Sequence, residues 1–402
     1  MSQRYLGGWI QEGLFNPLAI PTGGGHVQYS GMWTPQSQMQ AVEGGTWTGL
    51  PSLWSWGLNN SGQLGLGNTT NYSSPKQVGA STWNNISCGT YWSITTKTDG
   101  TLWTWGKNDL GQLGLGTSGA GTYKSSPNQV GALTNWSKVS AGGSFSLATK
   151  TDGTLWSWGD NGNGQLGLGN TTHYSSPKQV GALTTWSTIT TGSFSSLAVR
   201  TNGTLWAWGY NAFGQLGLGD ITSRSSPVQV GALTNWLNVS AGNVFTIATK
   251  TDGTLWSWGT NSFGQLGLGN ISQYSSPKQV GALTTWNNIS VGISYSIATK
   301  TDGTLWSWGG NNKGQLGLGN TTYYSSPKQV GSLTTWSKIS AGDGFSISIK
   351  TDGTLWSWGY NGFGNLALGN TTNYSSPKQV GALTSWLNVN SGGNLNTLAI
   401  HS

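Results

Sequence analysis

A segment of about 50 residues recurs seven times between residue 52 and the C-terminus, and this recurrence limits the fold more than any single residue does. Most copies contain L-W-x-W-G, then N-x-x-G-Q-L-G-L-G, then S-S-P-K-Q-V-G-A-L-T-x-W, and a run that ends in T-D-G-T. The first tryptophans of the copies lie 49, 53 and then four times 50 residues apart: Trp54, Trp103, Trp156, Trp206, Trp256, Trp306 and Trp356. Seven copies without a long insertion predict a closed ring.

Composition favours many short strands joined by tight turns. Charged residues make up 7% of the chain, against about 25% in an average soluble domain, and glycine fills 65 of 402 positions. The 25 tryptophans can fill a large core. The single cysteine, Cys88, excludes an internal disulfide framework and is interpreted as a small buried hydrophobe. No apolar run reaches the length of about 18 residues that a membrane span needs, so we expect no membrane insertion.

Each copy predicts a β-hairpin around its Asp-Gly pair. Asp152-Gly153 lies between two runs of strand formers, which favours a two-residue turn with positive φ at both positions. This register places Leu147 opposite Trp158, so that one face of the hairpin is bulky and the other is small. Propeller blades need such faces because large side chains of one sheet must pack on small ones of the next. We therefore predict an all-β, seven-bladed β-propeller over residues 51–402.

The two ends of the repeat region are expected to close the ring. The segment Leu398–Ile400 aligns with the strand that precedes the Asp-Gly turn, and Ser402 stands where that turn would begin. Ser52 stands where the strand after the turn would begin. We therefore expect the strand Leu53–Trp56 to pair with the C-terminal strand within one blade, which leaves no wide gap in the ring.

These motifs carry a family resemblance. W-G-x-N-x-x-G-Q-L-G-L-G, followed by P-x-Q-V and an A-G-x-x-F-S-L-A strand, resembles the repeat of the regulator of chromosome condensation family over residues 52–402. The resemblance implies a seven-bladed β-propeller. It also raises guanine-nucleotide exchange on a small GTPase, for which such proteins use a protruding hairpin. The only length excess here is three residues near Thr117–Gly121, so we do not expect exchange activity.

No catalytic constellation is found, and the chain is predicted not to be an enzyme. The histidines His26, His173 and His401 stand far apart in the repeat frame, and no nucleophile motif accompanies them. The recurring aspartates are interpreted as turn residues, and G-Q-L-G-L-G lacks the Lys-Ser/Thr ending of a phosphate loop. Asp160–Gly164 lacks the alternating acids of a calcium loop. We expect no cofactor and no metal.

The net charge of +7 is spread around the predicted ring. One set of cations precedes the turn residues: Lys97, Lys150, Arg200, Lys250, Lys300 and Lys350. A second set follows the Ser-Ser-Pro motif: Lys76, Lys178, Lys278, Lys328 and Lys378. We interpret both sets as solvated charges, with a weak surface for anionic glycans as the alternative. Chromatin binding in the resembled family relies on a basic tail, whereas residues 1–50 carry one arginine and two glutamates, so no specific nucleic-acid binding is expected.

Differences among the seven copies indicate a candidate binding surface. Three places vary: the residue after W-G, the residue before G-Q-L-G, and the pair after A-G. All three are expected at the open end of the hairpin, which we name the polymorphic rim; the opposite end is the Asp-Gly rim. Unconstrained loops would also vary, but aromatic residues gather at these places. The candidate ligand-contacting residues are Phe194, Tyr210, Phe213, Phe263, Tyr360 and Phe363.

Residues 1–50 break the period and form an irregular N-terminal extension. Their G-G-W-I and N-P-L stretch and their G-M-W-T-P-Q-S-Q-M-Q-A stretch resemble N-terminal segments of virion structural proteins from marine tailed bacteriophages. A linker or arm that packs on the propeller is the alternative. We predict a virion appendage attached through this segment to other virion proteins, with the polymorphic rim, as the face away from that segment, binding a host-surface glycan or protein. The runner-up is a cytoplasmic propeller that scaffolds or regulates a protein partner, including a GTPase; self-association stays open.

Overall fold

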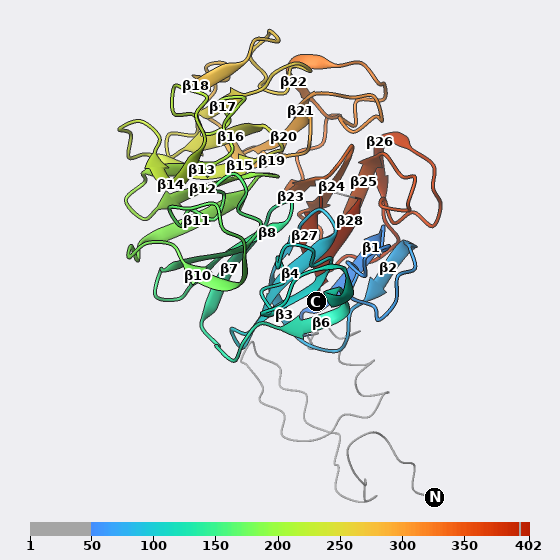
Figure 1. The fold of residues 1–402 in the computed structure, drawn as a ribbon. Coiled ribbons are helices and arrows are strands. Elements are labelled where there is room, and N and C mark those ends of the chain that lie inside the picture. Colours follow the sequence, from blue (N-terminus) through green and yellow to red (C-terminus); the bar gives the residue numbers. More distant parts are fainter. Residues whose placement is uncertain (1–49, 394) are drawn as a thin grey trace, which may run out of the picture. The chain divides into compact units, whose positions relative to one another are not determined.

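Seven four-stranded antiparallel sheets are arranged as blades around a common axis (Figure 1). The computed structural model describes residues 50–393 and 395–402. Within these residues the only helix is a 3-10 turn, η1 (Ala120–Thr122), and no helix is long and apolar enough to cross a membrane. The predicted all-β, seven-bladed propeller is confirmed. The irregular N-terminal extension predicted for residues 1–50 lies outside the described residues, apart from Leu50.

Six blades consist of four consecutive strands each, and the seventh joins the two ends of the chain. Given from the axis outward, blades one to three are β3(Trp83–Cys88), β4(Trp92–Lys97), β5(Leu102–Gly106), β6(Lys124–Gln129); β7(Trp136–Ala141), β8(Phe145–Lys150), β9(Leu155–Gly159), β10(Tyr174–Gln179); β11(Trp186–Thr191), β12(Ser195–Arg200), β13(Leu205–Gly209), β14(Arg224–Gln229). Blades four to six are β15(Trp236–Ala241), β16(Phe245–Lys250), β17(Leu255–Gly259), β18(Tyr274–Gln279); β19(Trp286–Val291), β20(Tyr295–Lys300), β21(Leu305–Gly309), β22(Tyr324–Gln329); β23(Trp336–Ala341), β24(Phe345–Lys350), β25(Leu355–Gly359), β26(Tyr374–Gln379). The closing blade is β27(Trp386–Ser391), β28(Asn396–His401), β1(Ser52–Gly57), β2(Tyr72–Gln77).

The hairpin at the Asp-Gly rim is one residue longer than the sequence predicted. Leu147 faces Ser157, not Trp158, because three residues separate the last paired positions: the Lys150 amide nitrogen donates to the Thr154 carbonyl at 3.1 Å. Only the glycine of the turn, Gly153, has a positive φ, of 77°. This is a type I turn followed by a left-handed glycine, the usual three-residue hairpin. The two-residue turn was therefore a wrong prediction.

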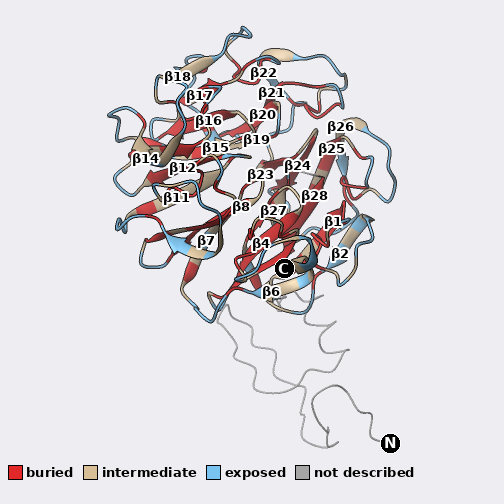
Figure 2. Ribbon diagram, viewed as in Figure 1, coloured by how far each residue is buried: buried red, intermediate tan, exposed pale blue. Residues whose placement is uncertain are grey.

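The corrected register explains how the blades pack. Phe145, Leu147 and Leu155 form one apolar face of blade two, and this face packs on Ala198 and Trp208 of blade three. Trp208 of the opposing sheet thus meets aliphatic side chains, and each blade junction contains its own buried apolar residues, which form two separate clusters between blades five and six. In Figure 2 the strands inside the blades are largely buried, and many loop segments at the two ends are exposed. The large-against-small packing expected of a propeller is present, although with different partners from those expected.

The glycines of G-Q-L-G-L-G let each loop approach the next blade. A Cβ on Gly317 would lie 2.8 Å from Nε1 of Trp358, and Gly317 has a φ of 72°. The same indole nitrogen donates to the Gln315 carbonyl at 2.9 Å. The recurring glycine therefore provides both a left-handed conformation and the space that the buried indole occupies.

Terminal strands close the ring as predicted. In β1, Leu53 pairs with Ile400 and Trp56 pairs with Thr397 of β28. Figure 1 shows the blue strands β1 and β2 beside the red strands that end the chain. The innermost strands are also joined from blade to blade by hydrogen bonds. For example, the Ala141 amide nitrogen donates to Ser87 Oγ at 3.0 Å.

Candidate binding rim

The structure brings the three variable places of each repeat to one rim. In blade two, Phe145 pairs with Gly159, and the amide nitrogen of Asp160 donates to the Ser144 carbonyl at 2.9 Å. The short loop before β8 and the long loop after β9 therefore lie side by side. The same bond joins Tyr210 to Phe194 in blade three, also at 2.9 Å. The backbone thus brings the variable positions of each repeat together at the polymorphic rim, as the sequence predicted.

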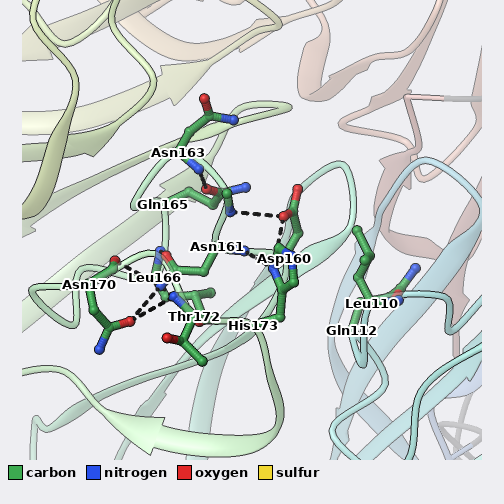
Figure 3. Close-up of polar contacts among 11 residues, drawn as sticks. Leu110, Gln112, Asp160, Asn161, Asn163, Gln165, Leu166, Asn170, Thr172 and His173 are labelled. Atoms are coloured by element: carbon green, nitrogen blue, oxygen red, sulfur yellow. Dashed lines mark hydrogen bonds and ion pairs between the residues drawn. The ribbon is translucent and has the colours of Figure 1, made fainter.

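An asparagine found in all seven copies and a glutamine found in six hold the long loop in shape. The amide group of Asn161 donates to the carbonyls of Asn170 and Thr172, both at 3.0 Å, and its Oδ1 accepts from the Leu166 amide nitrogen at 2.9 Å. Gln165 Oε1 accepts from the Asn163 amide nitrogen at 2.8 Å (Figure 3). Because the framework side chains bond to the backbone, the side chains at the variable positions are free to differ. Each blade therefore presents different side chains on nearly the same scaffold.

Four of the six predicted contact residues are exposed and two are half-buried. The exposed fractions are 41% for Phe194, 38% for Phe213, 43% for Phe263 and 37% for Phe363. Tyr210 and Tyr360 are intermediate. None of the six is buried between blades, as a purely structural aromatic residue would be.

These six residues do not form one patch but three groups. In blade three, the Tyr210 ring lies 6.3 Å from Phe194 and 6.3 Å from Phe213, edge to face in both cases. In blade six, Tyr360 lies 6.3 Å from Phe363. Phe263 of blade four stands apart from the other predicted residues. Edge-to-face contacts of this kind stabilise aromatic pairs while leaving part of each ring free.

Phe263 instead contacts a residue that the sequence reasoning missed. Its ring lies 5.7 Å from Tyr323, which belongs to the loop before β22 of blade five and is 45% exposed. Ile221 and Ile271, in the equivalent loops of blades three and four, are also exposed. The signal was present in the sequence, because N-T-T-x-Y varies at x and sometimes carries isoleucine in place of its first threonine.

In the described residues the aromatic side chains that are exposed lie in blades three to six, and together with the half-buried Tyr210 and Tyr360 of the same blades we name them the aromatic arc. It consists of the six predicted residues together with Tyr323: Phe194, Tyr210, Phe213, Phe263, Tyr323, Tyr360 and Phe363. Lys313 of blade five adds a cation over the Tyr360 ring, 5.6 Å from its centroid. Rings, aliphatic side chains and isolated polar groups are suited to stacking and hydrogen bonding with a largely neutral ligand.

The remaining three blades carry a polar sector at the same rim. Lys107 Nζ lies 2.8 Å from an Asp109 carboxylate oxygen, and the Tyr123 hydroxyl donates to the other oxygen. Burial and this bond to Asp109 raise the pKa of Tyr123 to about 12. The neighbouring extra residues form η1 and produce no protruding hairpin. Blades three and five also carry charges at this rim, the Asp220–Arg224 ion pair and Lys313, so the two sectors differ in their exposed rings and not in their charge.

His173 and Asp160 lie close together in this polar sector but do not form an ion pair. His173 Nδ1 accepts from the Asn161 amide nitrogen at 2.8 Å, which assigns the proton of the neutral ring to Nε2. The 3.2 Å approach of Asp160 Oδ1 to the same nitrogen is then a contact between two acceptors. Figure 3 shows both side chains directed at the start of the long loop, where Asp160 Oδ1 also accepts from the Gly162 amide nitrogen at 3.0 Å.

Contrary to the sequence interpretation, four cations of the first set, Lys150, Lys250, Lys300 and Lys350, are buried, whereas Lys97 and Arg200 are half-buried. Lys250 is 5% exposed, and its Nζ lies 3.6 Å from the ring centroid of Trp256 and 4.9 Å from that of Trp236. Burial lowers the pKa of Lys250. The other lysines of the set lie between the equivalent tryptophans, because a strand-end lysine can extend its apolar stem over two indoles. The second set is exposed, as expected, with each Nζ near a tyrosine ring of its own strand.

Recesses in the described part of the chain carry no catalytic set. Where the innermost strands end at the polymorphic rim, a cavity of about 110 Å³ is lined by small residues and by Cys88. Burial raises the pKa of the Cys88 thiol to about 12, so the thiol stays protonated and is a poor nucleophile. A groove of about 420 Å³ at the opposite rim is lined by Asn85, Lys97 and Asp99 among others. No three His, Cys, Asp or Glu side chains in the described ranges gather in a way that could hold a metal ion.

Comparisons with known proteins match this architecture. A family model described as the regulator of chromosome condensation (RCC1) repeat matches seven segments: 52–95, 99–149, 152–199, 202–249, 252–299, 302–349 and 352–399. The X-linked retinitis pigmentosa GTPase regulator of the dog is 32% identical over 131 residues. That match covers 31% of this chain and spans only 13% of the length of the relative.

Solved structures agree at the level of the fold. Human WBSCR16 superposes with a TM-score of 0.78 at 20% identity, covering 88% of this chain and 99% of the other. Prp20p of Saccharomyces cerevisiae, studied for its binding to Gsp1p and histones, superposes with a TM-score of 0.77 at 19% identity, covering 88% and 92%. At such identities the likeness shows the propeller and nothing about partners.

Proposed function

Because the chain belongs to the RCC1 repeat family, whose repeats cover it from residue 52 to residue 399, we propose that it is a non-enzymatic binding propeller that uses the aromatic arc to contact its partner. The observation that carries the proposal is the contrast within each loop. Asn211 and Gln215 are buried and bond to the backbone, whereas Phe213 between them is exposed. The fold needs the first two side chains and leaves the third available.

A glycan on a host-cell surface is the partner that this arc fits best. Exposed rings in neighbouring blades can stack on successive sugars, and each such contact contributes on the order of 1 kcal/mol. Weak contacts repeated on one rigid body combine into useful avidity when the ligand itself repeats. Lys313, over the Tyr360 ring, is an exposed cation beside the arc, and a single cation suits a neutral oligosaccharide better than a strongly anionic one.

The proposed setting is a virion appendage in which residues 1–50 attach to other virion proteins. Support comes only from the resemblance of that segment, which lies outside the described residues apart from Leu50. Mass spectrometry of purified virions tests this setting directly. Detection of the chain as a stoichiometric component supports it, and its absence from particles that adsorb normally contradicts it.

An array of neutral and acidic oligosaccharides tests the binding surface. The full chain is compared with Tyr210→Ala/Phe213→Ala and with Leu110→Ala, which alters an equivalent variable position in the polar sector. We expect binding to a neutral repeating glycan that the double substitution reduces at least tenfold and that Leu110→Ala leaves intact. Equal binding by all three proteins would place the site elsewhere.

A protein partner is the second candidate, and the relatives favour it. One of them is named a GTPase regulator, and Prp20p has been studied for its binding to Gsp1p. In the described residues the only expansion of the repeat is the short η1 segment, so we expect no acceleration of GDP release from a small GTPase. Faster release in the presence of the purified chain would favour this candidate over the glycan.

A further inference from the structure

One carboxylate of the polymorphic rim has no partner in the described part of the chain. Asp109, Asp160 and Asp220 at this rim each accept a hydrogen bond or pair with a cation. Asp343, in the loop between β23 and β24 of blade six, is half-buried and has neither kind of partner. An isolated carboxylate that is partly removed from water is unfavourable, so its presence here calls for an explanation.

The fold does not require a carboxylate at this place. The six equivalent residues of the other copies are not ionisable: Thr90, Gly143, Ser193, Asn243, Ile293 and Gly393. Burial raises the pKa of Asp343, which means that the folded chain disfavours its charged form. Desolvated charges without a structural partner are typical of functional sites. Asp343 is therefore a candidate for contact with a ligand.

Lys313 of blade five lies close to this loop. A Cβ on Gly344, the residue after Asp343, would lie 3.6 Å from Lys313 Cγ and 3.7 Å from Tyr360 Cβ. The Gly344 carbonyl accepts from the Tyr360 amide nitrogen at 2.8 Å, and Lys313 Nζ lies 5.6 Å from the centre of the Tyr360 ring. Lys313 is exposed, and none of the ion pairs in the described residues includes it or Asp343. Blades five and six thus place an unpaired cation, an unpaired carboxylate and an aromatic ring around one glycine.

A neutral sugar matches this combination of groups. A carboxylate only accepts hydrogen bonds and an ammonium group only donates them, whereas a hydroxyl group does both. Of two adjacent hydroxyl groups, one can donate to Asp343 while the other accepts from Lys313, and both bonds are charge-assisted. The C–H groups of the same sugar can pack on the rings of Tyr360 and Phe363, whose centres are 6.3 Å apart. An acidic sugar would instead be repelled by Asp343, and a cationic group would be repelled by Lys313.

We propose that Asp343 and Lys313 form the polar side of a sugar subsite beside the Tyr360 ring, and that this subsite selects a neutral sugar with two adjacent free hydroxyl groups. The subsite presupposes the proposed glycan-binding function and assigns its specificity to the junction of blades five and six. Blade three has Ser193 at the place of Asp343, so its rings contribute stacking but no unpaired carboxylate.

Binding isotherms of the full-length chain with neutral polysaccharides test the subsite. The probes are dextran, linear mannan and pectic galactan, which carry adjacent free hydroxyl groups, and laminarin, whose linkage leaves no such pair along its chain. We expect the unmodified chain to bind at least one of the first three and to bind laminarin about tenfold more weakly or not at all. Equal affinity for laminarin would overturn the selection of adjacent hydroxyl groups.

Conservative substitutions distinguish this subsite from the proposed function as a whole. Asp343→Asn keeps the shape of the side chain and removes its charge, and Lys313→Met keeps the stem beside Tyr360. Each should weaken binding about tenfold. The matched control is Asp109→Asn, which changes a carboxylate that is already paired with Lys107, and it should bind as the unmodified chain does.

Stability and affinity together decide the outcome. The melting temperature of Asp343→Asn should not fall, because the charge that it removes is desolvated and unpaired. A lower melting temperature would assign Asp343 to the fold and overturn the proposal. Unchanged binding by Asp343→Asn and Lys313→Met would overturn the subsite and leave the proposed glycan binding intact. Absence of binding to every neutral polysaccharide would contradict the proposed function itself, and the subsite with it.

Discussion

Asn390 Oδ1 accepts a hydrogen bond of 2.8 Å from the amide nitrogen of Cys88, joining residues 302 positions apart in the chain. Asn390 belongs to the closing blade and Cys88 to blade one. At other junctions a serine or threonine hydroxyl takes the same role, as Ser340 Oγ does for the Ser391 amide nitrogen at 2.8 Å. The loop that connects the closing blade to blade one is one residue shorter than the loops between the other blades. At this junction an asparagine replaces the hydroxyl residue.

Removing this acceptor should loosen the ring. Asn390→Ala leaves the buried Cys88 amide without a partner, so we expect the free energy of unfolding to fall by about 1–3 kcal/mol. The control is Ser240→Ala, because the Ser240 hydroxyl makes no hydrogen bond to the next blade in the described part of the chain; a change within about 0.5 kcal/mol is expected there. Chemical denaturation of both variants checks the difference, and equal effects would contradict a special role for the junction.

The seventh repeat carries a strained residue that can be relieved. Ala367 has a φ of 59° and replaces the glycine that stands at Gly317 in the copy before it. The indole of Trp56 next to this loop donates to the Asn365 carbonyl at 3.1 Å, against 2.9 Å in the Trp358 equivalent. Ala367→Gly should therefore raise the free energy of unfolding by about 1 kcal/mol.

The reciprocal change provides the control for this prediction. In Gly317→Ala the new methyl group would meet Trp358 at 2.8 Å, and the residue would be held at a positive φ. We expect a loss of stability at least as large as the gain from Ala367→Gly. Thermal melts of the two variants in the same buffer should show melting temperatures shifted in opposite directions. Shifts of the same sign would show that the positive φ does not determine the stability of these variants.

His401 should make stability depend on pH near neutrality. It stands where five other blades have a lysine, and its ring lies 5.0 Å from that of Trp386. Burial lowers the pKa of His401 below its usual value of 6.5. The unfolded chain therefore binds the proton more readily than the folded chain, and stability is lost as the pH falls from about 6.5 towards the lower folded pKa.

His401→Lys isolates this contribution, since it restores the residue type of the other blades. Melting temperatures between pH 7 and pH 5 should fall less in the variant than in the unmodified chain. Parallel curves would show that His401 does not titrate differently in the folded and unfolded states.

The sequence predicted the ring, the blade number and the closing strand because each depends on the repeat length and on alternation, which seven copies show repeatedly. It did not predict the turn, since Asp152-Gly153 fits both a two-residue and a three-residue loop, and only the bond from Lys150 to Thr154 decides between them. That one-residue difference changed every cross-strand partner.

The sequence also predicted which positions vary, but not which of them meet. Phe263 contacts Tyr323 from the next blade, and nothing in the spacing within one repeat relates those two residues. The burial of Lys250 was missed for a similar reason. A charged residue near a turn usually lies in solvent, and its position between Trp236 and Trp256 depends on packing between strands.

The sandwiched lysines should contribute to stability through their contact with the indoles. Lys250→Met keeps the apolar stem but removes the charge above Trp256, and we expect the free energy of unfolding to fall by about 0.5–2 kcal/mol. Lys278→Met, at an exposed position of the same blade, is the control and should change it by less than about 0.5 kcal/mol. Urea titration distinguishes the two; a Lys250→Met variant as stable as the control would mean that desolvation cancels the attraction.

Buried and exposed aromatic residues of this chain should differ in how much stability they lose on truncation to alanine. Phe245 is fully buried beneath the polymorphic rim, so Phe245→Ala should lower the free energy of unfolding by about 3–5 kcal/mol. Phe213, in the loop of the neighbouring blade, is 38% exposed and packs mainly on Tyr210, so Phe213→Ala should cost less than about 1 kcal/mol. A large loss from Phe213→Ala would show that the fold itself requires the ring. A small loss would show that the fold does not require the exposed ring of Phe213, as expected of a residue that contacts a ligand.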